Sequence, residues 1–174
     1  MIYKIRDNCT RSVLRSLYFS LFNSHLSYGI PVWAKSIYSN KLLLLQKKIV
    51  RAISFSKYSA PTKPIFKDLN ILRFDDIFKS QIASLMWDYD HDALPDELNS
   101  LFTRRSDFHS QNLRNARNQR LYTSTLRNTK YGSNSFSQVG SLLLNDLKDL
   151  NFYNDSTSKK VFMKKYKHSL IDEY

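Results

Sequence analysis

Residues 40–54 read NKLLLLQKKIVRAIS, and the apolar side chains of this stretch recur every three or four positions. The recurring residues form one stripe: Leu42, Leu45, Ile49 and Ile53. This is the spacing of one face of an α-helix, in which about 3.6 residues complete a turn. Three cations fall away from the stripe: Lys47, Lys48 and Arg51. The stretch predicts an amphipathic helix that turns its apolar stripe, with Leu45 and Ile49, toward a core.

Helical spacing continues over most of the chain. Apolar residues occur on nearly every side of 10–27, which predicts a central, buried helix that Thr10 caps and that Gly29 and Pro31 end. Other helical segments are expected at 64–66, 74–89, 95–102, 136–150 and 158–171. Their expected core residues are Ile77, Phe78, Ile82, Leu85, Met86, Val139, Leu142, Leu143, Leu147, Leu150, Val161, Phe162, Tyr166 and Leu170.

Only three glycines and four prolines occur among 174 residues, which argues against a turn-rich β fold. The predicted fold class is all-α: a small helical bundle, a basic extended arm and a small helical C-terminal tail. The composition sets the boundaries, because 103–131 is rich in Arg, Asn, Ser and Thr and poor in aliphatic residues. The predicted domains are 1–102 for the bundle, 103–131 for the arm and 132–174 for the tail.

The net charge of +12 is distributed unevenly. Residues 1–67 carry +11, 68–102 carry −6, 103–131 carry +6 and 132–174 carry +1. Two basic blocks therefore flank an acidic belt. A strongly basic, segregated charge favours a polyanionic partner such as DNA or RNA, since lysine and arginine contact phosphates whatever the base sequence.

The candidate nucleic-acid contacts are the cations of the two basic blocks: Arg11, Arg15, Lys47, Lys48, Arg51, Arg104, Arg105, Arg114, Arg117, Arg120, Arg127 and Lys130. Three aromatic residues lie among those of the arm, where they could stack on bases: Phe108, Tyr122 and Tyr131. For any single cation the alternative is a solvated basic surface.

Paired carboxylates at Asp75 and Asp76 raise the question of a two-metal catalytic site. An aromatic residue, Phe74, directly precedes the pair. In the polymerase motif, one variable residue separates the aromatic residue from the two aspartates. Because the pair stands where a helix is expected to begin, we favour the interpretation that it stabilises the helix dipole. An acidic cluster follows at the other end of this helix: Asp88, Asp90, His91 and Asp92. It lacks the spacing of a calcium loop, so we interpret it as a solvated helix end. His25 is expected in a core or an interface.

Other classes of site have little support in the sequence. Cys9 is the single cysteine, so an internal disulfide or a thiolate cluster is excluded. No metal and no cofactor are expected, because ligand spacings, a glycine-rich phosphate loop and a Gly-x-Ser-x-Gly elbow are lacking. The N-terminus, MIYKIRD, does not read as a signal peptide, and no apolar run approaches a membrane span. We expect an intracellular chain, in the nucleus or the cytoplasm, without a membrane partner.

Residues 17–33 read LYFSLFNSHLSYGIPVW, which resembles the segment after the palm in reverse transcriptases of non-LTR (LINE-like, jockey or CR1 type) retrotransposons. That family typically shows LYxSLxxxHLxYGIxVW there. Further matches are LLQKKIVRAI at 44–53, PIFKDLNIL at 64–72, DIF at 76–78, YGSNSF at 131–136, Gly140 and VFMKKYKHSL at 161–170. The resemblance covers nearly the whole chain and is most specific in about its first ninety residues.

The resemblance implies a thumb followed by a C-terminal tail. In the family, the helical thumb grips the template–primer duplex, while the catalytic palm and the fingers lie upstream. We therefore expect a nucleic-acid-gripping fragment of an RNA-directed DNA polymerase that is not an enzyme on its own. Its palm would be supplied elsewhere, or the chain would be a truncated copy of the element. Leu144 and Lys148 depart from the Trp and Pro that the family's tail carries. Two alternatives stay open: a reused or decayed helical module for protein contacts, and an enzyme built on Asp75 and Asp76.

Overall fold

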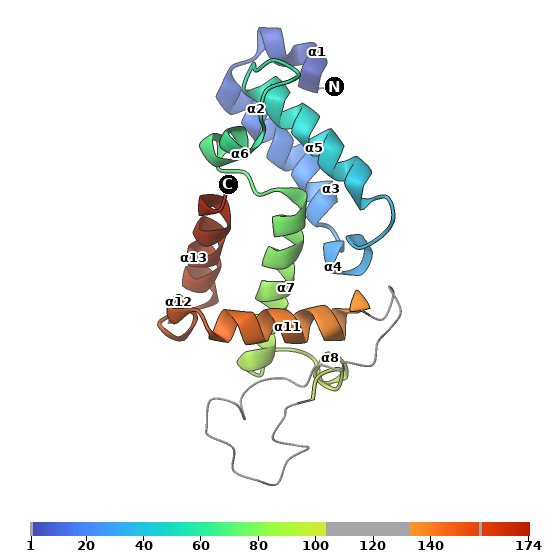
Figure 1. Ribbon diagram of the computed structural model, residues 1–174, viewed down its shortest axis with the longest axis vertical. Coiled ribbons are helices and arrows are strands. Elements are labelled where there is room, and N and C mark those ends of the chain that lie inside the picture. The colour runs from blue at the N-terminus through green and yellow to red at the C-terminus, as the bar shows by residue number, and fades with distance from the viewer. Residues whose placement is uncertain (1, 104–132, 157) are drawn as a thin grey trace. The chain divides into compact units, whose positions relative to one another are not determined.

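The computed structural model describes residues 2–103, 133–156 and 158–174 (Figure 1). Within these ranges the regular elements are helices and no strand occurs, which confirms the all-α class. The chain forms two compact units: Met1–Phe78 with Tyr166–Tyr174, called unit 1, and Lys79–Lys165, called unit 2. The predicted domains 1–102, 103–131 and 132–174 divide the chain differently and stay a prediction.

Unit 1 begins with α1 (Ile2–Ile5) and the 3₁₀ turn η1 (Arg6–Asn8). A continuous helical run follows, made of α2 (Arg11–Leu17), the π-helical stretch η2 (Tyr18–Asn23) and α3 (Ser24–Ser27). The run matches the helix predicted over 10–27, and Thr10 occupies its N-cap position. Within the described residues the Thr10 side chain makes no capping hydrogen bond to this helix, and its hydroxyl lies 3.1 Å from that of Ser12.

The expectation that this first helix is buried on all sides was wrong. Leu14, Tyr18 and Leu26 are buried, whereas Leu21 is 44% exposed and His25 is exposed. The π-helical stretch explains the difference, because its wider turns rotate each residue by less than the about 100° of an α-helix. Side chains after Tyr18 therefore fall behind α-helical phase. Leu26, rather than Leu21 or His25, continues the buried face.

Gly29, in the left-handed region at φ 60°, ends this run and leads into α4 (Ile30–Trp33). The helix predicted at 40–54 is α5 (Ser39–Ile53), with the expected bounds but a different buried face. Its fully buried residues are Gln46, Val50 and Ile53, together with nearly buried Ala52. Leu45 is 46% exposed, so its predicted core position was wrong. Ile49 is partly buried and packs against the core that contains Leu14 and Tyr18, which agrees in part with its predicted position.

Gln46 explains the rotated face. Its Nε2 donates hydrogen bonds to the Tyr18 hydroxyl and the Leu72 carbonyl, both at 2.9 Å. Its Oε1 accepts one from the Phe74 N–H at 2.8 Å. A buried amide is tolerated when its polar atoms are bonded, and these partners come from segments distant in the sequence. The predicted stripe contained apolar side chains alone, so it did not include the buried Gln46.

Unit 1 closes with α6 (Lys63–Leu69), the start of α7 (Phe74–Asp90) and the end of α13 (Lys159–Asp172). Asn70, at φ 52°, terminates α6 in the left-handed conformation. Phe66 and Leu69 of α6 join Leu14 and Val50 in one apolar core. In α7 the predicted core residues Ile77, Phe78, Ile82 and Met86 are buried, and Leu85 is half-buried.

Unit 2 holds the rest of α7 and α13, together with α8 (Asp96–Asn99), α11 (Phe136–Lys148) and α12 (Asn151–Asn154). Its core is aromatic: Trp87 stacks on Phe162 with centroids 4.7 Å apart, and Tyr153 meets Phe162 edge-on at 5.2 Å. Of the residues predicted for this core, Leu147 and Phe162 are buried. Those that proved exposed are Leu142, Leu150 and Val161.

The acidic end of α7 is less solvated than the sequence suggested. Asp90 accepts hydrogen bonds from the Lys148 ammonium at 2.7 Å and the Tyr153 hydroxyl at 3.1 Å. Asp88 accepts one from the Lys159 ammonium at 2.5 Å. The two carboxylates therefore bind α11, α12 and α13 to α7, which corrects their interpretation as a solvated helix end. None of the helices in the described residues is both long and apolar enough to cross a membrane.

Candidate nucleic-acid interface

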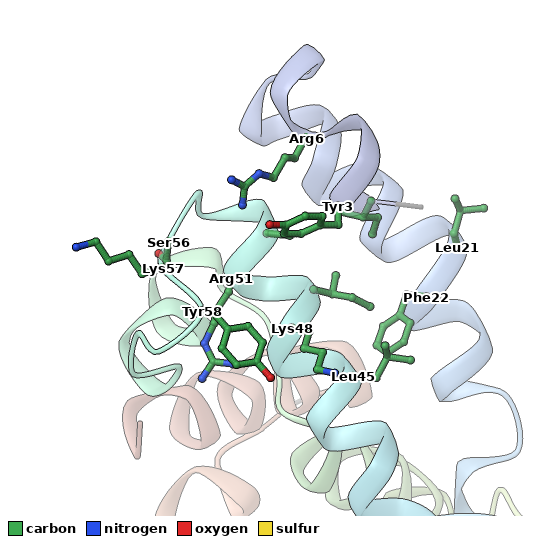
Figure 2. Close-up of a pocket in the computed structure, with 13 residues that line it drawn as sticks. Tyr3, Arg6, Leu21, Phe22, Leu45, Lys48, Arg51, Ser56, Lys57 and Tyr58 are labelled. Carbon is green, nitrogen blue, oxygen red and sulfur yellow. The ribbon is translucent and has the colours of Figure 1, made fainter.

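Unit 1 contains a surface hollow of about 730 Å³, enclosed by α1, η1, η2, α5 and the loop after α5 (Figure 2). Its walls are largely apolar. Leu21 and Phe22 come from η2, while Leu45, Ile49 and Ala52 come from α5. Leu21, Leu45 and Ile49 are among the residues whose spacing predicted a core. The phase shift of η2 and the rotated face of α5 leave Leu21 and Leu45 at the surface, whereas Ile49 also packs against the core.

Four cations also line the hollow: Arg6, Lys48, Arg51 and Lys57. No aspartate or glutamate occurs among its lining residues within the described part of the chain. Three separate segments supply the cations, since Arg6 comes from η1, Lys48 and Arg51 from α5, and Lys57 from the loop. Arg6 pairs with Asp7, which does not line the hollow. Lys48, Arg51 and Lys57 therefore carry most of the uncompensated positive potential, which attracts anions.

The two arginines are held in place, whereas the two lysines are not. The Arg51 Nε–H donates to the Ala60 carbonyl at 2.9 Å, and its guanidinium lies 5.8 Å from the centre of the Tyr58 ring. Arg6 lies 4.7 Å from the centre of the Tyr3 ring, and its Nε donates to Asp7 at 3.2 Å. Lys48 and Lys57 are exposed and form no ion pair within the described residues.

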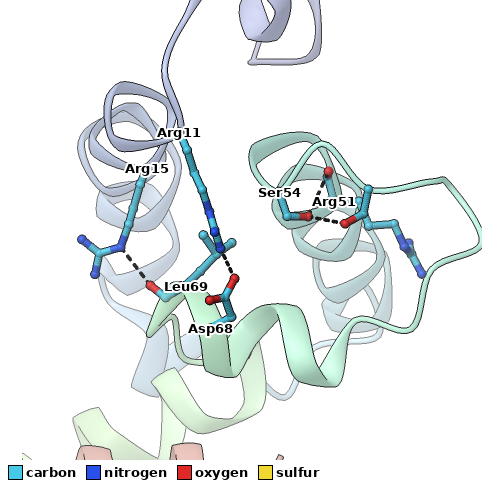
Figure 3. A network of polar contacts seen from close by, with 7 residues as sticks. Arg11, Arg15, Arg51, Ser54, Asp68 and Leu69 are labelled. Atoms are coloured by element: carbon cyan, nitrogen blue, oxygen red, sulfur yellow. Dashed lines mark hydrogen bonds and ion pairs between the residues drawn. The ribbon is translucent and has the colours of Figure 1, made fainter.

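The structure brings together only some of the predicted contact residues. Lys48 and Arg51 line the hollow, but Lys47, half-buried on another side of α5, does not. Arg11 pairs with Asp68, and the Arg15 Nε–H donates to the Leu69 carbonyl at 2.8 Å (Figure 3). These two arginines therefore fasten α2 to the end of α6 rather than lining the hollow.

The seven cations predicted in the arm lie outside the described residues: Arg104, Arg105, Arg114, Arg117, Arg120, Arg127 and Lys130. The aromatic residues of the arm, Phe108, Tyr122 and Tyr131, also lie outside them.

Among the residues of the hollow that sequence reasoning missed are Tyr3, Arg6, Lys57 and Tyr58. A weak signal for them exists. Tyr3 and Arg6 are three positions apart, the spacing of one helical face, and Lys57 and Tyr58 form a basic–aromatic pair. Neither signal says that the two pairs meet across α5, because that proximity depends on how the helices pack.

The carboxylates Asp75 and Asp76 both lie in the first turn of α7. Asp76 is buried, and its Oδ2 accepts a hydrogen bond from the Tyr174 hydroxyl at 2.6 Å. The same hydroxyl accepts a bond from the Arg73 N–H at 2.9 Å. Burial, together with Asp76, raises the pKa of the Tyr174 phenol. Among the described residues, no group of three or more His, Cys, Asp or Glu is placed to hold a metal ion.

Comparison of the chain with protein-family models, with curated proteins and with solved structures gave no match. The arrangement in unit 1 therefore has to be interpreted from its own chemistry. An apolar hollow surrounded by cations, with exposed tyrosines at Tyr3 and Tyr58, can bind an anion that also carries an apolar body.

Proposed function

We propose that this chain binds nucleic acid through the basic hollow of unit 1 and its surroundings, and that it catalyses no reaction by itself. The observation that carries the proposal is the meeting of Arg6, Lys48, Arg51 and Lys57 around one hollow without a lining carboxylate. The resemblance of the sequence to the thumb and tail of non-LTR reverse transcriptases supports the same function. On this proposal the chain grips a template–primer for a palm that another segment or chain supplies.

The distribution of charge between the units agrees with this proposal. Unit 1 contains fourteen Lys and Arg against six Asp and Glu, a net charge of +8. Unit 2 contains thirteen against nine, a net charge of +4, and residues 104–132 supply +6 of that balance. A polyanion gains affinity from unit 1, where neutralised phosphates release their counterions.

Salt dependence of duplex binding tests the proposal. The logarithm of the association constant should fall linearly with the logarithm of salt concentration, with a slope of about −4 to −5 if about five phosphates are neutralised. Changing Arg6, Lys48 and Lys57 together to glutamine should make the slope shallower by about two to three. Arg51 is left intact because its bond to Ala60 holds the loop.

The matched control removes the same charge from unit 2. Lys160, Lys164 and Lys165 are exposed lysines of α13, and their joint change to glutamine should alter the slope by less than about one. If both triple variants change the slope equally, the binding is a diffuse effect of net charge and the hollow is not the interface.

A second candidate function is a protein-contact module, which the exposed apolar residues around α4 favour: Tyr28, Val32, Ile37 and Tyr38. A module of this kind would associate with a partner protein and would show no steeply salt-dependent binding to DNA or RNA. Absence of salt-sensitive nucleic-acid binding by the full chain would favour this second function.

A further inference from the structure

The hollow of unit 1 combines cations with exposed aromatic rings, and a phosphate backbone alone would contact only the cations. Tyr3 is 68% exposed and Tyr58 is 77% exposed, and both line the hollow beside the apolar residues of η2 and α5. Figure 2 shows Tyr58 beside Arg51, and Tyr3 beneath Arg6. Each ring is thus paired with a guanidinium.

This combination narrows the class of occupant. An inorganic anion would engage the cations and leave the apolar walls in water. A base-paired duplex presents its phosphates, but its bases are stacked inside and cannot reach Ile49 or Ala52. An unpaired nucleotide has a flat base that stacks on tyrosine or arginine and a phosphate that lysine contacts. The volume of about 730 Å³ is within the roughly 300–1,000 Å³ of sites for small organic groups.

We infer that the hollow binds an unpaired base of a single-stranded segment. The base stacks on Tyr58 or Tyr3 against the apolar walls, and the adjoining phosphates contact Lys48 and Lys57. This inference rests on the proposed function and adds to it a preference for junctions between duplex and single strand. An acidic amphipathic peptide is the competing occupant, since it also offers apolar groups and negative charge, but it makes no particular use of two exposed tyrosine rings.

Three DNA probes of matched length test the inference with the full chain: a blunt duplex, the duplex with a short thymidine overhang, and the duplex with an abasic overhang. The two overhangs carry the same phosphates and differ only in the bases. The thymidine overhang should bind at least about tenfold more tightly than the abasic one, which corresponds to about 1.4 kcal/mol. A 2-aminopurine base in the overhang should lose fluorescence on binding, because stacking quenches it.

Two variants and one control locate the effect. Tyr58→Ala and Tyr3→Ala should each reduce the ratio between thymidine and abasic overhangs without changing the salt slope, since neither alters the charge. Tyr28→Ala is the control, because Tyr28 is 85% exposed and does not line the hollow. All three side chains are exposed, so their removal should leave the helical circular dichroism unchanged.

The outcomes separate the inference from the function on which it rests. Equal affinity for thymidine and abasic overhangs, with a steep salt slope for both, would overturn the base-binding inference and leave nucleic-acid binding intact. No salt-dependent binding of any probe would overturn both. If the two overhangs bind equally and a Glu- and Leu-rich helical peptide displaces them, the hollow is a peptide site and the inference is wrong.

Discussion

Gln46 shows how one residue can set the orientation of a helix. Its amide makes three hydrogen bonds inside the core of unit 1, to groups of Tyr18, Leu72 and Phe74. A buried donor or acceptor left unbonded costs roughly 1–3 kcal/mol, so rotating α5 to bury Leu45 would leave several groups unsatisfied. The hydrogen bonds therefore outweigh the gain from burying one more leucine, which is about 2 kcal/mol.

Stability measurements on α5 should reflect this orientation. Val50→Ala, at a fully buried position, should lower the free energy of unfolding by about 2 kcal/mol, because two methyl groups leave the core. Leu45→Ala should cost less than about 1 kcal/mol although it removes more atoms, since Leu45 is half-exposed. Urea unfolding of both variants measures the two costs. The reverse order would restore the stripe predicted from spacing.

Tyr18 should make the stability of unit 1 sensitive to alkaline pH. Burial raises the pKa of its phenol from 10.0 to about 12, and the hydrogen bond from Gln46 opposes that rise. The unfolded phenol loses its proton near pH 10, whereas the folded one keeps it. Its contribution, at most about 3 kcal/mol, is therefore full below about pH 10 and is lost between about pH 10 and pH 12.

The pH dependence of unfolding checks this contribution. In Tyr18→Phe the free energy of unfolding should fall less steeply above about pH 10 than in the unmodified chain. Tyr28→Phe is the control, because Tyr28 is exposed, and it should follow the unmodified chain. Identical slopes for the Tyr18 variant and the control would mean that Tyr18 does not titrate differently on folding.

At the scale of elements, the π-helical stretch η2 decides which side chains of the first helical run reach the hollow. The π-helical turns of η2 bring Leu21 and Phe22 to the hollow, although α-helical spacing places Leu21 with Leu14 and Tyr18. Local sequence rules assume one period along a helix. A change of period inside a helix is therefore invisible to them until the packing is known.

The two aspartates in the first turn of α7, Asp75 and Asp76, are the residues on which the enzyme alternative depends. Asp76 is buried and bonded to Tyr174, and Asp75 lies 3.9 Å from the Arg73 guanidinium, so each carboxylate has a partner within the fold. We expect the chain, given primer–template, nucleotides and Mg²⁺, to extend no primer in a gel assay. A polymerase fragment with an intact palm serves as the positive control. Extension that Asp75→Asn abolishes would contradict this expectation and support the enzyme alternative.

At the scale of the whole molecule, the cations around the hollow of unit 1 predict where a polyanion protects lysines. With a saturating overhang probe, acetylation of Lys48 and Lys57 should slow several-fold, because the phosphates cover both ammonium groups. Lys160, Lys164 and Lys165 of α13 serve as internal controls and should react at nearly unchanged rates. Mass spectrometry of proteolytic peptides measures all five sites at once. Equal protection of both groups would indicate binding without a defined face.

The sequence by itself determined the all-α class and the bounds of α5, α7 and α13 to within about a residue or two. Helix bounds depend on groups at most a few positions apart, such as Gly29 and the apolar periodicity, and these are visible in the chain. The segregation of basic residues toward the N-terminal part was also evident from composition alone, and with it the candidate class of partner.

Only the tertiary structure decided which faces are buried and which cations meet. Gln46 is buried because its partners lie 26 and 28 positions away, and Leu45 is left at the surface as a consequence. Tyr3 and Tyr58, more than fifty positions apart, come to one hollow because α1 packs on α5, which leads into the loop that carries Tyr58. Periodicity describes a single helix, whereas burial and proximity depend on hydrogen bonds and packing between segments that the sequence separates.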